Sequence, residues 1–134
     1  MSSKKYVYIY TDGGKEKWAF VIVKDKKIIH EESGVFGLYA STSNDDTESE
    51  GIFRALQYAK EHPDNYILTT DSQAMIAKIN GNMVNVTKNP NINGIKSILK
   101  EFKESQLPVS FSIKWDKRLS NEFMKRADEL CKDS

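Results

Sequence analysis

Hydrophobic residues along the chain follow two different periods, and the change from one period to the other marks the predicted elements. Three segments near the N-terminus, residues 6–11, 17–24 and 27–33, are rich in aromatic and β-branched side chains, which is typical of strands. The connections between them are short, and Asp25 and Lys26 predict a tight turn. Three such strands in succession predict an antiparallel meander, followed by a loop over residues 34–42.

The next stretch predicts a helix that connects the meander to a further strand. The helix begins within residues 43–47, which include Ser, Asn, Asp and Thr, and it ends at His62, before Pro63. Its apolar stripe consists of Ile52, Phe53, Ala55, Leu56 and Ala59. Residues 65–70 predict a fourth strand, and the helix before it is long enough for this strand to lie parallel to an earlier one.

The second half of the chain predicts helices around one more strand. A short helix covers residues 72–80, with Ala74, Ile76 or Ala77 available to face the sheet. A loop over residues 81–90 precedes a longer helix over residues 91–105. Alternating apolar and polar positions predict a fifth strand over residues 107–115, and a final helix covers residues 121–132. The order of elements predicts an α/β fold with a mixed sheet.

Composition narrows the class of protein. With 134 residues, 39% of them hydrophobic and 29% charged, we expect one globular domain spanning residues 1–134. No apolar run reaches membrane-spanning length and the first residues lack an apolar signal core, so we expect a cytoplasmic protein without membrane contacts. We also expect it to be a monomer. The single cysteine, Cys131, fits a reducing compartment.

The net charge of the chain is too small to attract nucleic acid over the whole surface of the protein. Twenty basic and 19 acidic residues give a net charge of +1, so nucleic-acid binding has to depend on local patches. The only arginines are Arg54, Arg118 and Arg126, and lysine does not contact base edges in the bidentate manner of arginine. This composition disfavours sequence-specific DNA recognition.

Carboxylates stand at positions that the predicted sheet could bring together. Asp12 follows the first strand and Asp71 follows the fourth, while Glu48 lies in the first turns of the connecting helix and Asp128 in the last helix. Taken alone, Asp12 with Gly13 is more typical of a hairpin turn. Clustered carboxylates repel one another unless a cation neutralises them, and a set of hard oxygen ligands favours magnesium or manganese over zinc.

Four motifs occur in an order that resembles the type 1 ribonuclease H family. They are TDG at residues 11–13, TSNDDTESEGIFRAL at 42–56, TTDSQAMI at 69–76 and NEFMKRADEL at 121–130. The resemblance covers nearly the whole chain. It implies a ribonuclease H-like fold with a five-stranded mixed sheet, in the order 3-2-1-4-5, and helices on both faces.

The resemblance also implies a site. Asp12, Glu48, Asp71 and Asp128 are then the catalytic carboxylates and the ligands of two Mg²⁺ ions about 4 Å apart, with Mn²⁺ as a possible substitute. Glu50 competes for the role of Glu48, and Glu122 or Glu129 for that of Asp128. The implied substrate is an RNA/DNA hybrid, cut in its RNA strand to leave a 5′ phosphate. The implied substrate-binding residues are Asn44 and Gln73 at the minor groove, Ser43 at a phosphate, and Arg118 in place of a loop histidine.

Two other hypotheses remain open at this stage. The segment after Asp12 is short for the family, and Asn121 and Asp128 are farther apart than usual. These departures are compatible with a nucleic-acid-binding domain of the same fold that has lost turnover. A nuclease of the same fold acting on a junction or another duplex is the second alternative, because one fold hosts several reactions.

Overall fold

The computed structural model describes residues 5–14, 16–35, 44–80, 90–105, 109–117 and 119–132, except the side chains of 44–46, 80, 90 and 91. Along these residues the chain forms, in order, β1 (Val7–Gly13), β2 (Lys17–Lys24), β3 (Lys27–Val35), α1 (Asn44–Glu61), β4 (Asn65–Thr70), α2 (Gln73–Asn80), α3 (Pro90–Glu104), β5 (Ser110–Trp115) and α4 (Glu122–Lys132). Among them, no helix is long and apolar enough to cross a membrane.

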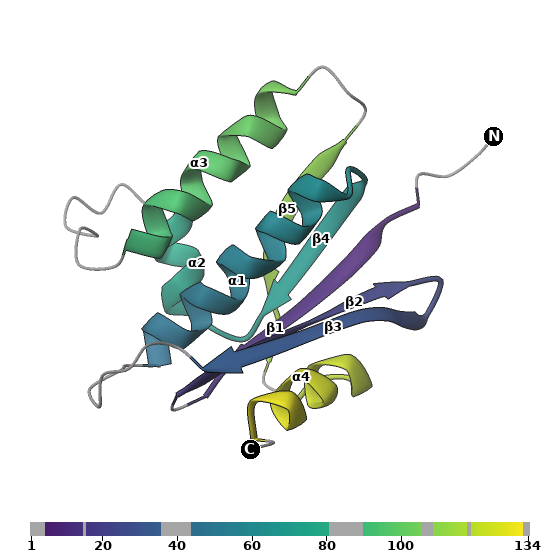
Figure 1. Ribbon diagram of the computed structural model, residues 1–134, viewed down its shortest axis with the longest axis vertical. Coiled ribbons are helices and arrows are strands. Elements are labelled where there is room, and N and C mark those ends of the chain that lie inside the picture. The colour runs from purple at the N-terminus through teal and green to yellow at the C-terminus, as the bar shows by residue number, and fades with distance from the viewer. Residues whose placement is uncertain are drawn as a thin grey trace.

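The strands form one five-stranded mixed sheet in the order β3-β2-β1-β4-β5. β1 pairs with β2 in the antiparallel sense and with β4 in the parallel sense, while β5 is parallel to β4. Figure 1 shows α1 and α3 on one side of this sheet and α4 on the other. The predicted fold class, the strand order and the helices on both faces are therefore confirmed.

The centre of the sheet is buried on both faces. In β2, the residues from Trp18 to Val23 are all buried, because α1 covers one face of the strand and α4 covers the other. Ile9 of β1 and Leu68 of β4 contribute to the large core under α1. A smaller cluster under α4 contains Val21 and Val23. Burial on both sides explains why these segments lack a simple alternation of apolar and polar residues.

Several predicted boundaries are wrong, and pairing explains two of them. β1 continues through Asp12 and Gly13, since these residues pair with Ala19 and Trp18 of β2. β3 continues to Val35, which pairs with Lys17, so part of the expected loop over 34–42 is strand. The remaining residues of that loop, 36–42, lie outside the described part of the chain, as do residues 81–89 of the second predicted loop.

The predicted fifth strand and the face of the short helix also need correction. β5 begins at Ser110 rather than at residue 107, and residues 106–108 are outside the described ranges. In α2 the buried residues are Met75 and Ile79, whereas Ala74 and Ala77 are exposed. Ile76, the third residue of the predicted inward face, is half-buried, so the prediction was wrong for the two alanines. The longer side chains of Met75 and Ile79, four residues apart on one face of the helix, fill the core instead.

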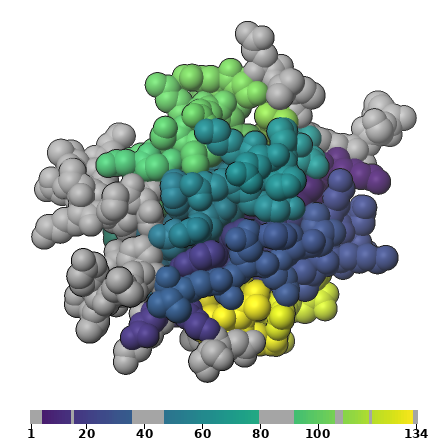
Figure 2. Space-filling view, in the orientation of Figure 1, coloured from purple at the N-terminus to yellow at the C-terminus, as the bar shows by residue number. Residues whose placement is uncertain are grey.

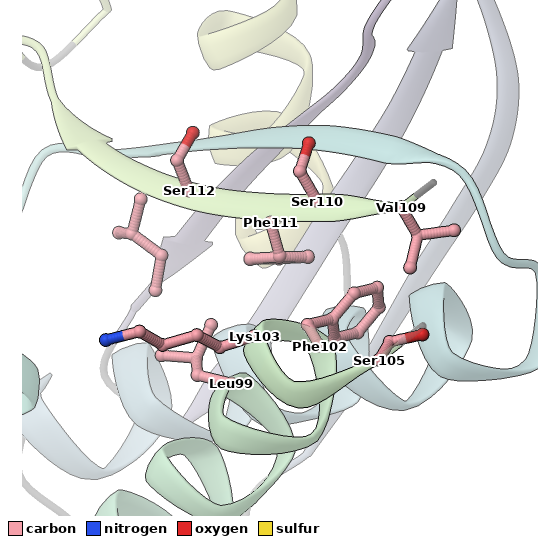
Figure 3. Close-up of a pocket in the computed structure, with 9 residues that line it drawn as sticks. Leu99, Phe102, Lys103, Ser105, Val109, Ser110, Phe111 and Ser112 are labelled. Atoms are coloured by element: carbon pink, nitrogen blue, oxygen red, sulfur yellow. The ribbon is translucent and has the colours of Figure 1, made fainter. Parts of the chain in front are cut away.

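The surface is hollowed between α3 and the outer strand β5. The groove has a volume of about 530 Å³, and its apolar lining residues are Leu99, Phe102, Val109, Phe111 and Ile113. Figure 3 shows Leu99 and Phe102 of α3 facing Phe111 of β5 and Val109 just before that strand. Figure 2 shows α1 lying between α3 and the strands β2 and β3 on the face in view. The groove contains none of the candidate carboxylates.

The glycine at the end of β1 allows a close approach of α1. A Cβ atom at Gly13 would lie 2.5 Å from the Glu48 backbone nitrogen and 2.7 Å from Thr47 Oγ1. At the neighbouring Gly14 a Cβ atom would meet Cys131 Cβ at 3.6 Å, which is ordinary van der Waals contact. The first turn of α1 can therefore pack on β1 only if residue 13 has no side chain.

We expect Gly13→Ala to lower the free energy of unfolding by roughly 3 kcal/mol, the upper end of the range for overpacking, because the atoms in its way include rigid helix backbone. Gly14→Ala is the matched control and should change it by less than about 1 kcal/mol. Urea unfolding of both variants measures the difference. Equal effects of the two substitutions would contradict this account of the contact between β1 and α1.

Candidate active site

Three carboxylates from separate elements lie together at one end of the sheet. Asp12 belongs to β1, Glu48 to the first turns of α1, and Asp71 follows β4; one ligand oxygen from each lies within 4.8 Å of the others. The parallel register of β1 and β4 pairs Tyr10 with Thr69, so Asp12 and Asp71 each come two residues later at the same edge. The expectation that the sheet brings these carboxylates together is correct.

A backbone amide orients two of these carboxylates. The Gly13 N–H donates to Asp12 Oδ1 at 2.9 Å and to Glu48 Oε1 at 3.2 Å. Beside it, Thr47 Oγ1 donates to the Gly14 carbonyl oxygen at 2.7 Å. The hairpin turn expected at Asp12 exists but lies further along the chain, where the Gly14 N–H donates to the Lys17 carbonyl oxygen at 2.8 Å. Asp12 itself is a strand residue with its carboxylate held in place.

Glu48 is a better fit to the site than its competitor Glu50. The Glu50 carboxylate accepts a hydrogen bond from Arg54 Nε at 2.8 Å, one helical turn away on α1. Glu48 is 6% exposed, and its Oε2 is buried with no hydrogen-bond partner in the described part of the chain. A buried carboxylate oxygen without a partner is costly, and a cation bound beside it would offset this cost.

Helix α4 places Asp128 next to Asp12. Asn121 caps the helix, since its Oδ1 accepts from the backbone N–H groups of Phe123 and Met124 at 2.9 Å each. The inner face that follows consists of Met124, Ala127, Asp128 and Cys131. Asp128 is 8% exposed, and its carboxyl group is close enough to that of Asp12 to raise the pKa of Asp12. The spacing of seven residues between Asn121 and Asp128 thus still turns Asp128 inward.

The two alternatives to Asp128 point elsewhere. Glu122 is exposed, and the Glu129 side chain is 62% exposed and pairs with Arg126 at 3.1 Å. Arg126 also makes a two-pronged contact with the Glu31 carboxylate of β3, at 2.6 and 3.1 Å, which ties α4 to the sheet. Among the three acidic residues of α4, the geometry therefore favours Asp128.

Lys132 is a cation at the site that the sequence argument did not identify. Its Nζ lies 2.9 Å from Asp128 Oδ2, one helical turn earlier on α4. The spacing of four residues between an acidic and a basic side chain was a visible signal for this pair. Lys132 partly neutralises Asp128, whereas the group of Asp12, Glu48 and Asp71 has no such lysine among its described contacts.

Crowding of the carboxylates makes them hard to ionise. Burial, then the charge of Asp71, then the contact with Asp128 raise the pKa of Asp12 to about 7. Burial and the charges of Asp71 and Asp12 raise the pKa of Glu48 to about 9. Burial, followed by the charges of Asp12 and Glu48, also raises the pKa of the Cys131 thiol to about 12, so this cysteine is a neutral packing residue.

Of the four residues predicted to contact the substrate, the structure describes the side chain of Gln73 alone. Gln73 opens α2 and is exposed, immediately beyond Asp71 and Ser72. Ser72 caps this helix, its Oγ accepting from the Met75 N–H at 3.1 Å. Asn44 opens α1, but its side chain is outside the described part of the chain, as are Ser43 and Arg118. The roles of Asn44, Gln73, Ser43 and Arg118 stay predictions.

Comparisons with known proteins agree on one family. The family model RNase H matches residues 4–134. The ribonuclease H1 from the halophilic archaeon Halobacterium salinarum NRC-1 is 22% identical, with a TM-score of 0.71 over 96% of this chain and 99% of that one. LC11-RNase H1, isolated from compost by a metagenomic approach, is 26% identical with a TM-score of 0.72, covering 94% of this chain and 92% of that one. The same enzyme in complex with an RNA/DNA hybrid matches at 24% identity with a TM-score of 0.72, over 92% of each chain. No curated protein matches the chain.

The raised pKa values predict how stability depends on pH without divalent ions. Unfolding returns Asp12 and Glu48 from pKa values of about 7 and 9 to their ordinary 3.8 and 4.5, so the native state binds more protons between these limits. The stabilising contribution of these groups to the free energy of unfolding is therefore complete below pH about 4, and it is lost as the pH rises through 7 and 9.

In a chelating buffer, the free energy of unfolding should fall between pH 5 and 9, by an amount on the order of a few kcal/mol. Glu48→Gln should flatten the upper part of this curve, and Mg²⁺ or Mn²⁺ should restore stability most at high pH. Urea unfolding at successive pH values provides the measurement. A parent stability that is level or rises over this range would contradict the predicted repulsion.

Proposed function

The chain belongs to the ribonuclease H family, and from this premise we propose that it is a divalent-metal-dependent endonuclease that cuts the RNA strand of RNA/DNA hybrids. Ribonuclease H activity comes with the family; the metal mechanism, the substrate and the roles of individual residues form the proposal. The observation that carries it is the group of Asp12, Glu48 and Asp71, whose ligand oxygens lie within 4.8 Å of one another.

The donor set fits a hard divalent cation. All three groups are carboxylates, no histidine or thiol is among them, and Glu48 Oε2 is buried without a hydrogen-bond partner among the described residues. Oxygen ligands of this kind suit Mg²⁺ or Mn²⁺ better than zinc. When bound, such ions supply a water nucleophile of lowered pKa and offset the negative charge that develops on the leaving oxygen.

Asp12 is the residue best placed to be shared between two ions. Asp12 belongs to the group with Glu48 and Asp71, and Asp128 of α4 also raises the pKa of Asp12, so Asp12 is a neighbour of all the candidate ligands. By the resemblance to the family, Glu48 and Asp71 would hold one ion, Asp128 would hold the other and Asp12 would contact both. The Gly13 N–H keeps the Asp12 and Glu48 carboxylates in fixed orientations, which reduces the reorganisation needed when a cation arrives.

The hybrid substrate is supported by the position of Gln73 and by one of the similar structures. Gln73 is exposed at the start of α2, next to the carboxylates, where its amide can reach a nucleic acid across the site. An amide both donates and accepts hydrogen bonds, which suits the minor groove of a hybrid with its 2′ hydroxyl groups. LC11-RNase H1 has been solved with an RNA/DNA hybrid. We propose the same substrate class here.

The carboxylate group also bears on the binding-domain hypothesis. A domain that had lost turnover would not need four buried or half-buried acidic groups in mutual repulsion, because such a group lowers stability without a cation. Asp12, Glu48 and Asp128 are each less than a tenth exposed. Their retention at this cost favours an active nuclease.

We expect purified protein with Mg²⁺ to cut a labelled RNA/DNA hybrid in its RNA strand, and to leave duplex DNA intact. Chelation of the metal should abolish the cut, and Asp71→Asn should reduce the rate by at least about 100-fold, since it removes a ligand itself rather than an outer partner. Hybrid that stays intact with the parent protein, or equal cutting by the Asp71→Asn variant, would overturn the proposal. Preferential cutting of duplex RNA or a junction would instead identify the second nuclease hypothesis.

The acidic residues of α4 provide a matched pair of variants. Asp128→Asn should slow hybrid cleavage by about tenfold or more, because its carboxyl group meets Asp12. Glu129→Gln removes the adjacent charge, which pairs only with Arg126 at the surface among the contacts described for it, and should leave the rate within about twofold. Initial rates at saturating Mg²⁺ compare the two. If Glu129→Gln lost more of the cleavage rate than Asp128→Asn, Glu129 would be the fourth ligand instead of Asp128.

A further inference from the structure

A tryptophan at the end of β5 contacts the backbone of one of the proposed metal ligands. The indole Nε1–H of Trp115 donates to the carbonyl oxygen of Asp71 at 3.1 Å. The two residues are 44 positions apart in the chain, and the contact exists because β5 lies beside β4, with Trp115 paired to Thr70. Figure 1 shows these two strands side by side, with α2 following the end of β4.

Of the three grouped carboxylates, only Asp71 lies outside a helix or strand. Asp12 is held in β1 and Glu48 in α1, whereas Asp71 lies between the last residue of β4 and the first residue of α2. Its neighbours are fixed by other bonds: the Asp116 N–H donates to the Thr70 carbonyl oxygen at 3.1 Å, and the Ser72 N–H donates to Thr70 Oγ1 at 3.2 Å. The bond from Trp115 reaches Asp71 itself.

Core packing does not account for this tryptophan. Phe111 and Ile113 share its face of β5 and pack against the main core, but Trp115 at the end of the strand is 44% exposed. A half-exposed indole gains only part of the free energy that burial of a tryptophan can supply. Its polar edge, in contrast, has a defined partner next to the site.

We propose that Trp115 is a positioning residue for Asp71: its indole N–H fixes the peptide group of Asp71 and thereby holds the Asp71 carboxylate among the metal-binding oxygens. This inference rests on the proposed function, since it concerns the affinity of the same site for divalent ions. Metal–oxygen bonds tolerate only small displacements of a ligand, so a peptide free to rotate at residue 71 weakens the site before the fold is lost.

The test removes the indole N–H and measures metal binding directly. In Trp115→Phe the ring remains apolar but the donor is lost, and we expect Mn²⁺ to bind about 3- to 10-fold more weakly, as for the loss of one hydrogen bond. Isothermal titration of Mn²⁺ into the metal-free protein gives this number without any activity assay. The Mg²⁺ concentration for half-maximal hybrid cleavage should rise by a similar factor, with the rate at saturating Mg²⁺ within about twofold of the parent.

Trp18→Phe is the matched control. Trp18 is 5% exposed, stacks on Phe20 with 6.3 Å between ring centroids and has the Arg54 guanidinium 5.2 Å from its ring. Its replacement should lower the melting temperature but leave the Mn²⁺ affinity within about twofold. If both variants lose affinity in proportion to their loss of stability, Trp115 has only a structural role and the proposal is overturned.

A second replacement covers the case in which Trp115→Phe fails to fold. Benzothienylalanine at position 115 has the size and shape of tryptophan with sulfur in place of the N–H group, so it removes the hydrogen bond alone. It should reproduce the weaker Mn²⁺ binding while the melting temperature stays near that of the parent. Parent-like Mn²⁺ affinity in this variant would also overturn the proposal.

The outcomes separate this inference from the proposed function. A parent protein that binds Mn²⁺ and cuts hybrid, together with unchanged variants, overturns the role of Trp115 alone. A parent that binds Mn²⁺ but leaves hybrid intact overturns the substrate assignment, and the titration still decides the role of Trp115. A parent that binds no divalent ion overturns both.

Discussion

The arrangement of this site depends on one close approach, that of the first turn of α1 to the end of β1. Gly13 permits it, because any Cβ atom there would overlap the backbone of residues 47 and 48. The same residue supplies the N–H that both Asp12 and Glu48 accept. Contact between the helix and the strand is thus also what brings two like charges together, so folding and assembly of the site cannot be separated.

Repulsion between the carboxylates of Asp12, Glu48 and Asp71 links the stability of the fold to the binding of a cation. Two buried carboxylates with pKa values raised to about 7 and 9 make the metal-free state less stable near neutral pH, and a divalent cation removes that cost on binding. The neighbouring elements resist relaxation: α4 is tied to β3 through Arg126 and Glu31, and Asp71 is tied to β5 through Trp115. Rigid surroundings keep the charges close, and this closeness favours a cation over an empty site.

Local patterns predicted some features well and others poorly. The strands of the meander were visible because they are rich in aromatic and β-branched side chains, and the long helices because their apolar residues recur with the helical period. Asp25 and Lys26, both with positive φ, form the turn expected of them. The inward positions of α2 were predicted wrongly at Ala74 and Ala77, because the apolar residues of this short helix are spread around it and do not mark one face. Asp12 was ambiguous for a different reason: Asp-Gly is a turn signal, and only its pairing with Ala19 shows that the strand continues through it.

The sequence by itself determined which residues could form the site, since the ordered motifs around Asp12, Glu48 and Asp71 identify the family without coordinates. It could not choose between Asp128 and its acidic neighbours. The choice depends on which side of α4 faces the sheet, and this was decided by the Asn121 cap and by the contact of Arg126 with Glu31 of a distant strand. The bond from Trp115 to Asp71 is likewise absent from any local pattern, because it joins two strands that become neighbours only in the folded sheet.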